Sequence, residues 1–553
     1  MLNRRSFLTR STLAAGAGAP VAAPRIARSA EQILATPGQK PKKIIHIVSD
    51  GMSVGTLTCS DLYSKLIREK TLTWTRLMHE PTTRVTLMNT RSLNSMVTDS
   101  SAASSAWGSG SRVVNGAVNV LPDGTLLTPL YKLFADAGWK TGLVTTAEIT
   151  HATPAGFATA VRSRGDSQAI ALQYLDRKVD VLLGGGRPFF SAASRKDKRD
   201  LKVEFRSAGY AIALNRDELM AAPTDTRLFG VFASGHLPYT IDHRSDPALI
   251  ASTPTLAEMT TAALDRLGRS ENFILQVEGA RIDHAAHNSD APAAIHDQIA
   301  LDEAIDVVLA YQKQNPDTLV VITTDHANSN LGLNGMGGGY RTSSQQFATV
   351  RDVKMSYPEI VKRLEKAGEK IKVAKYPDDP EDRMNIPDPM AKVDPNGKVE
   401  GDKAADDKTK FTAAVQADAV RVDPAKIIDI LAETTGYRMS RRRAELFARS
   451  LAGDLPQLYD QMNPVVTQLG QLMANRIGIG WTGNTHTADY VQLLALGPGS
   501  ERFSGLVENT DIFTHYTALA GIDFKNVTAP LIAHSGPEAQ EVEHSHRYAS
   551  AWA

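Results

Sequence analysis

Continuous apolar runs alternate along this chain with segments of helical periodicity. Five runs are rich in β-branched and other apolar residues, as expected of strands buried on both faces, and they span residues 44–50, 141–147, 179–186, 272–280 and 318–325. Helical patterns such as LYKLFADAGW at 130–139 and DEAIDVVLAYQKQ at 302–314 separate them. This alternation predicts an α/β fold in which a doubly wound, mostly parallel sheet carries helices on both faces.

The pattern changes after Asn334. A short helix is predicted near 357–367, and residues 376–410 are so rich in proline and charge that they predict a solvated or irregular segment. Helical patterns return at 423–437, 440–454 and 456–476, the first with Asp423 as the expected N-cap and Pro424 at the first helical position. The run at 485–499 resembles a strand again. We therefore predict that residues 335–480 are an insertion within a single catalytic domain spanning 36–545.

Composition narrows the function classes. A length of 553 residues suggests three or four domains of about 150 residues each, but the ligand-type residues described below are too widely spread for that division. Lys+Arg and Asp+Glu balance at 61 each, so no excess positive charge indicates nucleic acid as an obligate partner. The single cysteine, Cys59, excludes an internal disulfide, and a hydrophobic content of 42% can supply a core instead.

The N-terminus resembles a twin-arginine export signal. Arg4 and Arg5 are followed by Phe7, Leu8 and an Ala/Gly-rich stretch, although an ordinary basic tail is the alternative. Residues 1–35 are therefore left out of the predicted fold, and the expected location is periplasmic or secreted. No later stretch approaches the ~20 apolar residues that a membrane span needs, so none is expected.

Residues of metal-ligand type lie at or just beyond the ends of separate predicted strands. They are Asp50, Glu278, Asp283, His287, Asp325 and His326. Because the carboxyl ends of parallel strands meet at one edge of a sheet, these side chains are expected to converge. The Asp283/His287 spacing of four suits one face of a helix turn and a metal such as zinc. The alternatives are a helix N-cap for Asp50, a structural turn for the adjacent Asp325 and His326, and a solvated helix face for the others.

A serine and an arginine add possible anion chemistry. Ser100 stands at the head of the small-residue segment SAASSAWGSG, where a helix N-terminus would present unpaired N–H groups to an anion. Serine at such a position is also a common N-cap. Arg164 has a planar fork that could hold two phosphate oxygens, or it could be an ordinary surface arginine.

Taken together, these segments resemble the alkaline phosphatase family. The match is by motif and order, over about 40–335 and 480–525: DGM at 50–52, TDS at 98–100 with an Ala/Ser helix and Trp107, HATP with Thr153, SR with Arg164, QVEGA at 276–280, ID with Asp283, TTDHA at 323–327 and THT with His486.

The resemblance implies a phosphomonoesterase that forms a phosphoserine on Ser100 at a two-zinc centre. Asp283, His287 and His486 would bind one zinc; Asp50, Asp325 and His326 would bind the second, which also contacts Ser100; and Asp50, Thr153 and Glu278 would hold a third metal, usually magnesium. Arg164 would clamp the phosphate and Asp99 would orient Arg164. The implied substrates are small phosphate monoesters, and a homodimer is one possible assembly.

Two positions depart from the best-studied bacterial members of the family. Those members have an aspartate where this chain has His151 and a lysine where it has His284. Imidazole favours zinc over magnesium, so the third metal is expected to be magnesium or a third zinc. Loss of the lysine removes a fixed positive charge near the phosphate. The alternative functions are a phosphodiesterase of the same superfamily and an exported metal- or phosphate-binding protein without turnover.

Overall fold

The computed structural model describes residues 40–335, 339–375, 415–455 and 459–532. The predictions for the export signal at 1–35 and for the charged segment at 376–410 lie outside these residues. Among the helices of the described ranges, none is long and apolar enough to cross a membrane.

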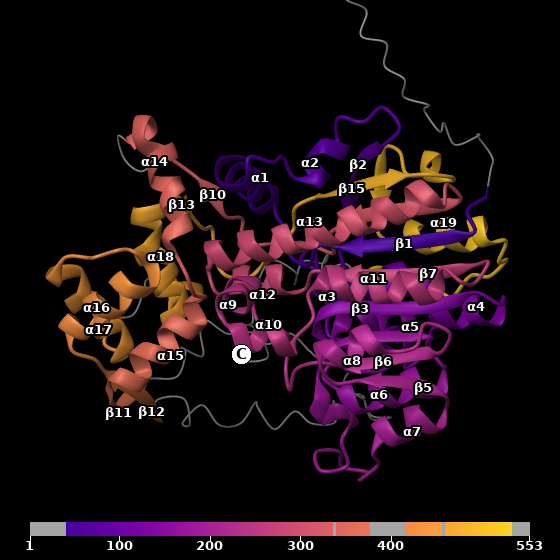
Figure 1. Cartoon of the computed structure of the whole chain (residues 1–553), viewed down its shortest axis with the longest axis horizontal. Coiled ribbons are helices and arrows are strands. Elements are labelled where there is room, and N and C mark those ends of the chain that lie inside the picture. The colour runs from indigo at the N-terminus through magenta and orange to yellow at the C-terminus, as the bar shows by residue number, and fades with distance from the viewer. Residues whose placement is uncertain (1–39, 336–338, 376–414, 456–458, 533–553) are drawn as a thin grey trace, which may run out of the picture. The chain divides into compact units, whose positions relative to one another are not determined.

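The main sheet has ten strands in the order β16-β2-β15-β8-β1-β7-β3-β4-β6-β5 (Figure 1). Their bounds are β1 Lys43–Val48, β2 Arg84–Asn89, β3 Lys140–Glu148, β4 Val181–Gly185, β5 Tyr210–Ala213, β6 Arg227–Val231, β7 Phe273–Glu278, β8 Thr318–Thr323, β15 Val491–Leu496 and β16 Leu506–Glu508. Only the two pairs that β15 makes, with β8 and β2, are antiparallel, so β15 alone runs against the others. The predicted doubly wound, mostly parallel sheet is confirmed.

The five predicted runs are the five adjacent central strands β8, β1, β7, β3 and β4, and the strand-like run at 485–499 contains β15. Four strands were not predicted: β2, β5, β6 and β16. Each lies at or near an edge of the sheet; β16 has three residues, β5 has four, and β2 has an exposed face. These three strands lack the continuous apolar signal of a strand that is buried on both faces, whereas β6 is largely buried and was missed although it is as long as β4.

Helices cover both faces because successive strand residues point to opposite sides. Ile45 and Ile47 of β1 pack in one buried cluster with residues of α1 (Val54–Arg68), α11 (Leu256–Leu267) and α13 (Ala291–Gln314). Ile44 and Val48 pack in another with residues of α4 (Leu130–Asp136), α5 (Ala152–Ala158) and α19 (Asp511–Ala520). In the view of Figure 1, α11 and α13 lie in front of the sheet.

The remaining helices before β8 are short. They are α2 (Thr73–Leu77), α3 (Ser100–Ser109), α6 (Ser167–Asp176), α7 (Leu201–Ser207), α8 (Arg216–Ala221), α9 (Thr240–Ser245), α10 (Pro247–Ser252) and α12 (Arg281–His287). Two of them, α3 and α12, carry predicted site residues.

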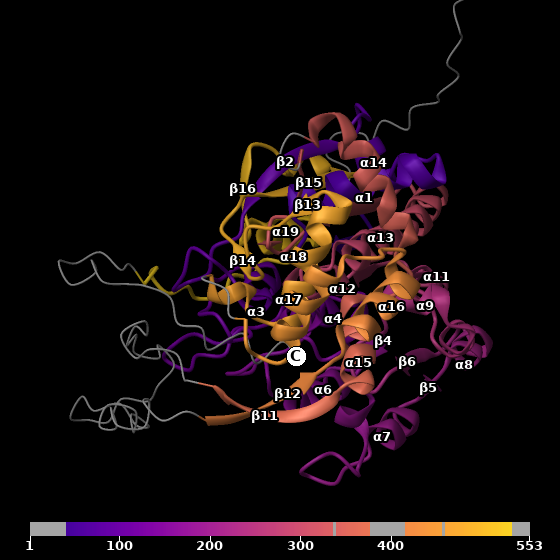
Figure 2. The same ribbon diagram turned by 90° about the vertical axis from the view of Figure 1, so that its left-hand side faces the viewer.

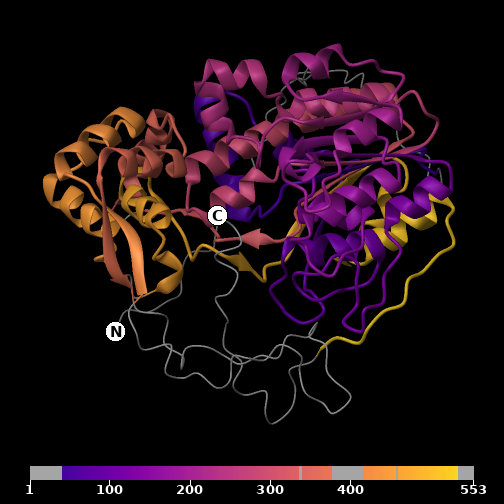
Figure 3. The same cartoon turned by 90° about the horizontal axis from the view of Figure 1, so that it is seen from below.

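The segment predicted as an insertion leaves and returns at one point. Gly332 and Leu333 of β10 pair antiparallel with Gly480 and Ile479 of β13. Between these strands lie α14 (Ser343–Ala348), α15 (Tyr357–Ala367), α16 (Pro424–Thr435), α17 (Arg441–Leu451), α18 (Val465–Ile477) and the hairpin of β11 (Glu369–Lys375) with β12 (Val415–Arg421). Figure 3 shows these elements gathered together, in coral to orange, and Figure 2 shows them from the side. This arrangement supports our proposal that 335–480 is an insertion.

Individual helix predictions in this segment can be compared with the structure. The helix at 357–367 matches α15, and Asp423 caps α16 by accepting a hydrogen bond from Ala425 N, with Pro424 at the first helical position. The last helix begins at Val465 rather than near 456. Pro464 explains the difference, because the residue before a proline is disfavoured in helical conformation.

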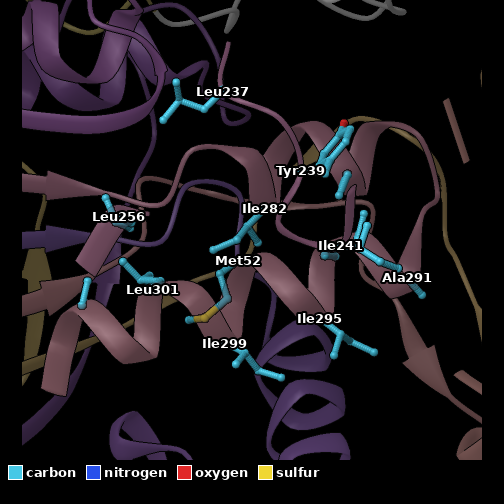
Figure 4. Packing of buried hydrophobic residues seen from close by; sticks show 14 of the residues in the cluster. Met52, Leu237, Tyr239, Ile241, Leu256, Ile282, Ala291, Ile295, Ile299 and Leu301 are labelled. Atoms are coloured by element: carbon cyan, nitrogen blue, oxygen red, sulfur yellow. The ribbon is translucent and has the colours of Figure 1, made fainter. Parts of the chain in front are cut away.

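A buried apolar cluster anchors two of the segments that carry ligand-type residues. Met52, Ile282 and Ile299 belong to the same cluster (Figure 4). Met52 lies two residues after Asp50, and Ile282 directly precedes Asp283. Each such side chain contributes about 1.5–3 kcal/mol when fully buried, so the backbone on either side of the site is held by the core.

Helices α3 and α5 approach each other through two glycines. A Cβ on Gly108 would lie 1.9 Å from the carbonyl oxygen of Gly156, and a Cβ on Gly156 would lie 2.2 Å from the Ser104 hydroxyl oxygen. Ser100 is the first residue of α3 and Thr153 the second of α5. The glycines therefore set the spacing between two predicted site residues.

We expect Gly108→Ala to destabilise the fold by about 1–3 kcal/mol, because backbone atoms of α5 must move to admit the methyl group. Gly332→Ala is the matched control, since a Cβ there would meet nothing within 4 Å. Thermal unfolding of both variants measures the effect. Equal unfolding temperatures would contradict the close packing of α3 on α5.

Candidate metal and phosphate site

The ligand-type residues converge at the carboxyl ends of three neighbouring strands. Asp50 follows β1, Glu278 ends β7, and Asp325 and His326 follow β8. His486 is brought in by a small antiparallel pair, in which β14 (His486–Thr487) lies against β9 (Ala327–Asn328) directly after His326. The structure thus brings together residues that are more than 400 positions apart in the chain.

One group of possible metal ligands consists of Asp283, His287 and His486. His287 Nε2 lies 3.3 Å from Asp283 Oδ2 and 3.1 Å from His486 Nε2. His287 Nδ1 donates to the carbonyl oxygen of Asn484 at 2.7 Å, and His486 Nδ1 donates to that of Thr98 at 2.8 Å.

Those two backbone contacts determine which nitrogen of each imidazole ring carries the hydrogen. Since a carbonyl oxygen can only accept, each neutral ring carries its hydrogen on Nδ1 and presents a lone pair at Nε2. Two lone pairs 3.1 Å apart repel each other unless a cation lies between them. One carboxylate and two oriented imidazoles form a donor set that suits zinc.

A second group consists of Asp50, Asp325 and His326. Asp325 Oδ1 accepts hydrogen bonds from the backbone N–H groups of Gly51 at 3.1 Å and His326 at 3.0 Å, which leaves Oδ2 3.1 Å from His326 Nε2. Ser100 Oγ also lies 3.1 Å from His326 Nε2 and is fully buried. The serine hydroxyl is therefore adjacent to the second group.

The third group shares Asp50 and adds Glu278 and His151. Thr153 Oγ1 lies 3.4 Å from Asp50 Oδ2, and Thr145 Oγ1 donates to Glu278 Oε2 at 2.6 Å. The predicted neighbourhood of Asp50, Thr153, Glu278 and His151 is therefore present in the structure.

Arg164 is held beside these groups. Its Nη1 donates to Asp99 Oδ2 at 3.0 Å and its Nη2 donates to His151 Nε2 at 3.2 Å. Asp99 Oδ2 also accepts from Ser101 Oγ and from the Gly116 backbone N–H. Burial opposes ionisation of Asp99, but the Arg164 charge and these donors hold its pKa below the usual value. Arg164 is thus a positioned side chain, and the surface-arginine alternative is wrong.

The observed helix N-caps test whether Asp50 and Ser100 are themselves capping residues. Ser53, not Asp50, caps α1, and Asp99, not Ser100, caps α3 by accepting from Ala102 N. The N-cap interpretation of Asp50 and of Ser100 is therefore wrong. Asp50 Oδ1 is buried and accepts no hydrogen bond from any residue in the described part of the chain.

Burial and mutual repulsion dominate the electrostatics of the carboxylates. Burial, with the charges of Asp325 and Asp283, raises the pKa of Asp50 well above its usual value, and burial raises the pKa of Glu278 to about 7. Burial acts on Asp283 in the same direction, but His287 and His486 hold its pKa well below the usual value. Burial and nearby His326 lower the pKa of His486 to about 3, so its ring is neutral and suited to bind a cation.

Two residues of this neighbourhood, His236 and Arg281, were not predicted. The rings of His151, His236 and His284 pack together, with centroids 4.3 Å apart for His236 and His284. Arg281 Nη1 donates to His284 Nδ1 at 2.8 Å. Arg281 lies one helical turn before His284, a spacing that could have indicated the contact, whereas no motif surrounds His236.

Comparison with known proteins agrees with this geometry. A sequence model described as "Alkaline phosphatase" matches residues 41–420. The chain belongs to the alkaline phosphatase family.

Individual relatives cover most of the chain. Alkaline phosphatase 3 of Bacillus subtilis is 31% identical over 75% of this chain and 75% of its own length. Streptomycin-6-phosphate phosphatase of Streptomyces griseus is 31% identical over 59% of this chain and 81% of its own. The crystal structure of Thermus thermophilus alkaline phosphatase, 31% identical, superimposes with a TM-score of 0.74 over 91% of this chain and 96% of that one. The chain is a phosphomonoester hydrolase of this family.

The residues present fit the metal dependence of the alkaline phosphatase family. Four carboxylates, those of Asp50, Glu278, Asp283 and Asp325, are fully buried in one place, and Asp50 Oδ1 has no protein donor among the described residues. Divalent cations would supply the positive charge that these groups lack.

We expect chelation with EDTA to lower the unfolding temperature, because each bound ion stabilises the folded state by roughly 3 kcal/mol at a hundredfold excess over its Kd. Asp50→Asn, which neutralises a carboxylate shared by two groups, should respond less to EDTA than the parent. Thermal unfolding with and without chelator measures both responses. Identical curves for the parent in both conditions would show that these groups hold no metal.

Proposed function

We propose that this protein hydrolyses small phosphate monoesters at a two-zinc centre through a phosphoserine formed on Ser100. The observation that carries the proposal is the position of the Ser100 hydroxyl, which lies against His326 of one metal-ligand group while Asp99, the preceding residue, holds Arg164. A nucleophile, a cation site and an anion clamp thus lie around one small space.

The first zinc would be held by Asp283, His287 and His486, and the second by Asp50, Asp325 and His326. Bound zinc would place positive charge on the phosphate oxygens, stabilise the departing oxygen and lower the pKa of the attacking hydroxyl. The protein residues do the rest. Ser100 attacks phosphorus in line, and the Arg164 fork holds two phosphate oxygens in the orientation set by Asp99. Attack of water on the phosphoserine then releases phosphate and restores the serine.

The third metal would be held by Asp50, Thr153 and Glu278. Oxygen donors from these three residues suit magnesium, whereas the nearby His151 offers nitrogen and suits zinc. We therefore propose magnesium that is bound weakly, or a third zinc. Elemental analysis of the purified protein, before and after dialysis against magnesium, decides between them.

The competing functions predict different substrates. A phosphodiesterase would hydrolyse bis(4-nitrophenyl) phosphate faster than 4-nitrophenyl phosphate, and a binding protein would retain zinc and phosphate but hydrolyse neither ester. The Arg164 fork, held by Asp99, could contact two oxygens of a dianion, and together with the three groups of possible metal ligands it favours the monoester.

Ser100→Ala should abolish hydrolysis of 4-nitrophenyl phosphate and phosphoenzyme trapping at acid pH, and leave the zinc content nearly unchanged. The loss should exceed about a thousandfold, because the nucleophile is removed while the ligands stay. Ser109→Ala, at the other end of α3, is the matched control. Trapped phosphoenzyme in the Ser100 variant would assign the nucleophile to another residue.

We also propose export by the twin-arginine route to the periplasm or medium, on the basis of the N-terminal sequence alone. Replacing Arg4 and Arg5 with lysine should leave active enzyme in the cytoplasm, which fractionation of expressing cells would measure. Unchanged export would point to another route. Sedimentation of the purified protein would test the homodimer.

A further inference from the structure

A second guanidinium lies beside the proposed phosphate site. Arg281 is the first residue of α12, two residues before Asp283, and its Nη1 donates to His284 Nδ1 at 2.8 Å. The His284 ring lies 5.5 Å from the His151 ring between centroids, and His151 Nε2 accepts from Arg164 Nη2. A continuous row of side chains therefore joins the proposed phosphate clamp to Arg281.

Arg281 is held in place without a close ion pair among the described residues, although burial raises the pKa of Asp297 and of Asp242 and the Arg281 charge opposes that rise. Its guanidinium carbon lies 3.7 Å from the centroid of the Tyr239 ring, and the Tyr239 hydroxyl accepts from Asn288 Nδ2 at 3.1 Å. Among the described carboxylates, none forms an ion pair with Arg281, and its Nε is buried without a hydrogen-bond partner in the described ranges. A half-buried guanidinium without a close ion pair would be stabilised by an anionic ligand that accepts its hydrogen bonds.

The neighbouring imidazoles present donors in the same place. Arginine cannot accept a hydrogen bond, so His284 Nδ1 is the acceptor and the neutral ring carries its hydrogen on Nε2. His236 Nδ1 accepts from the backbone N–H of Glu148 at 3.1 Å, so its hydrogen is on Nε2 as well. Arg281 and His236 are both partly exposed. These three side chains are termed the donor patch.

We propose that the donor patch of Arg281, His284 and His236 binds a second anionic oxygen group on the alcohol part of the phosphate ester. The guanidinium fork matches a carboxylate or a phosphate in two hydrogen bonds, and either group would give Arg281 the close ion pair that it lacks among the described residues. The favoured substrates are then phosphorylated compounds that carry a further carboxylate or phosphate. This inference rests on the proposed hydrolase function and names its substrate class.

The test uses two esters that differ in one group. Glycerol 3-phosphate and 3-phosphoglycerate are both primary alkyl phosphates, but the second carries a carboxylate in place of a hydroxymethyl group. Arg281→Gln should lower kcat/KM for 3-phosphoglycerate at least about tenfold, mainly through KM, because a charged hydrogen bond is lost. The values for glycerol 3-phosphate should stay nearly unchanged. Arg281→Lys, which keeps the charge, should retain part of the preference.

Arg269→Gln is the matched control. Arg269 is exposed, donates to Thr224 Oγ1 at 2.7 Å and precedes β7, at the edge of the sheet opposite the site. Arg269→Gln should leave kcat/KM for both esters unchanged. Equal loss of activity on both esters in Arg281→Gln would show that Arg281 only positions His284 and would overturn the proposal. Unchanged kinetic constants for both esters in Arg281→Gln would also overturn the proposal.

A measurement on the parent enzyme covers the case in which Arg281→Gln does not fold. Phosphonoacetate should inhibit glycerol 3-phosphate hydrolysis more tightly than methylphosphonate, since only the former carries a carboxylate. Equal inhibition constants would overturn the donor patch as an anion site. If the parent hydrolyses neither ester, the proposed function itself fails, and that outcome is distinct from a loss of selectivity.

Discussion

The burial of four carboxylates in one place is the constraint on which the rest of the structure depends. Asp50, Glu278, Asp283 and Asp325 are removed from water and lie close enough to raise one another's proton affinity, a state that is tolerable only with cations among them. Four imidazoles and a guanidinium lie around this negative centre, yet Asp50 Oδ1 accepts no hydrogen bond among the described residues. Bound metal would supply the positive charge that this centre lacks.

Main-chain atoms hold the ligands in their working orientation, so the site cannot be separated from the fold. The backbone carbonyls of Asn484 and Thr98 orient two imidazoles, and the backbone N–H of Gly51 orients Asp325. Pairing of β14 with β9 sets His486 beside His326 although the two are 160 positions apart in the chain. A change that shifts these backbones would alter metal binding without touching a ligand.

The sequence allowed the centre of the fold and most of the site to be predicted, for identifiable physical reasons. Strands such as β1 are buried on both faces and need unbroken apolar runs, and ligands such as Asp50 occur in short motifs at their ends. Two strands at or near the sheet edge were not predicted: β2, because many of its side chains are exposed, and β16, because three residues are too few for a pattern. His236 was not predicted as a site residue because a lone histidine in a loop gives no periodic signal. Its ring contacts that of His284 only in the folded chain.

Arg281 supplies positive charge next to His284, a position where the sequence alone indicates that a charge is missing. From the sequence, His284 in place of the lysine of the best-studied bacterial members removes a positive charge near the phosphate. In the structure the Arg281 guanidinium lies 2.8 Å from that imidazole, so a positive charge is present next to position 284, on a side chain that is more exposed than the nearly buried His284. Coulomb attraction falls with distance, so the Arg281 charge would act less on the phosphoryl group than a charge at position 284, and more on whatever the ester carries beyond it. We infer that this arrangement separates two tasks that a lysine at position 284 would combine: release of product phosphate becomes easier, while selection of the substrate's alcohol part is assigned to Arg281.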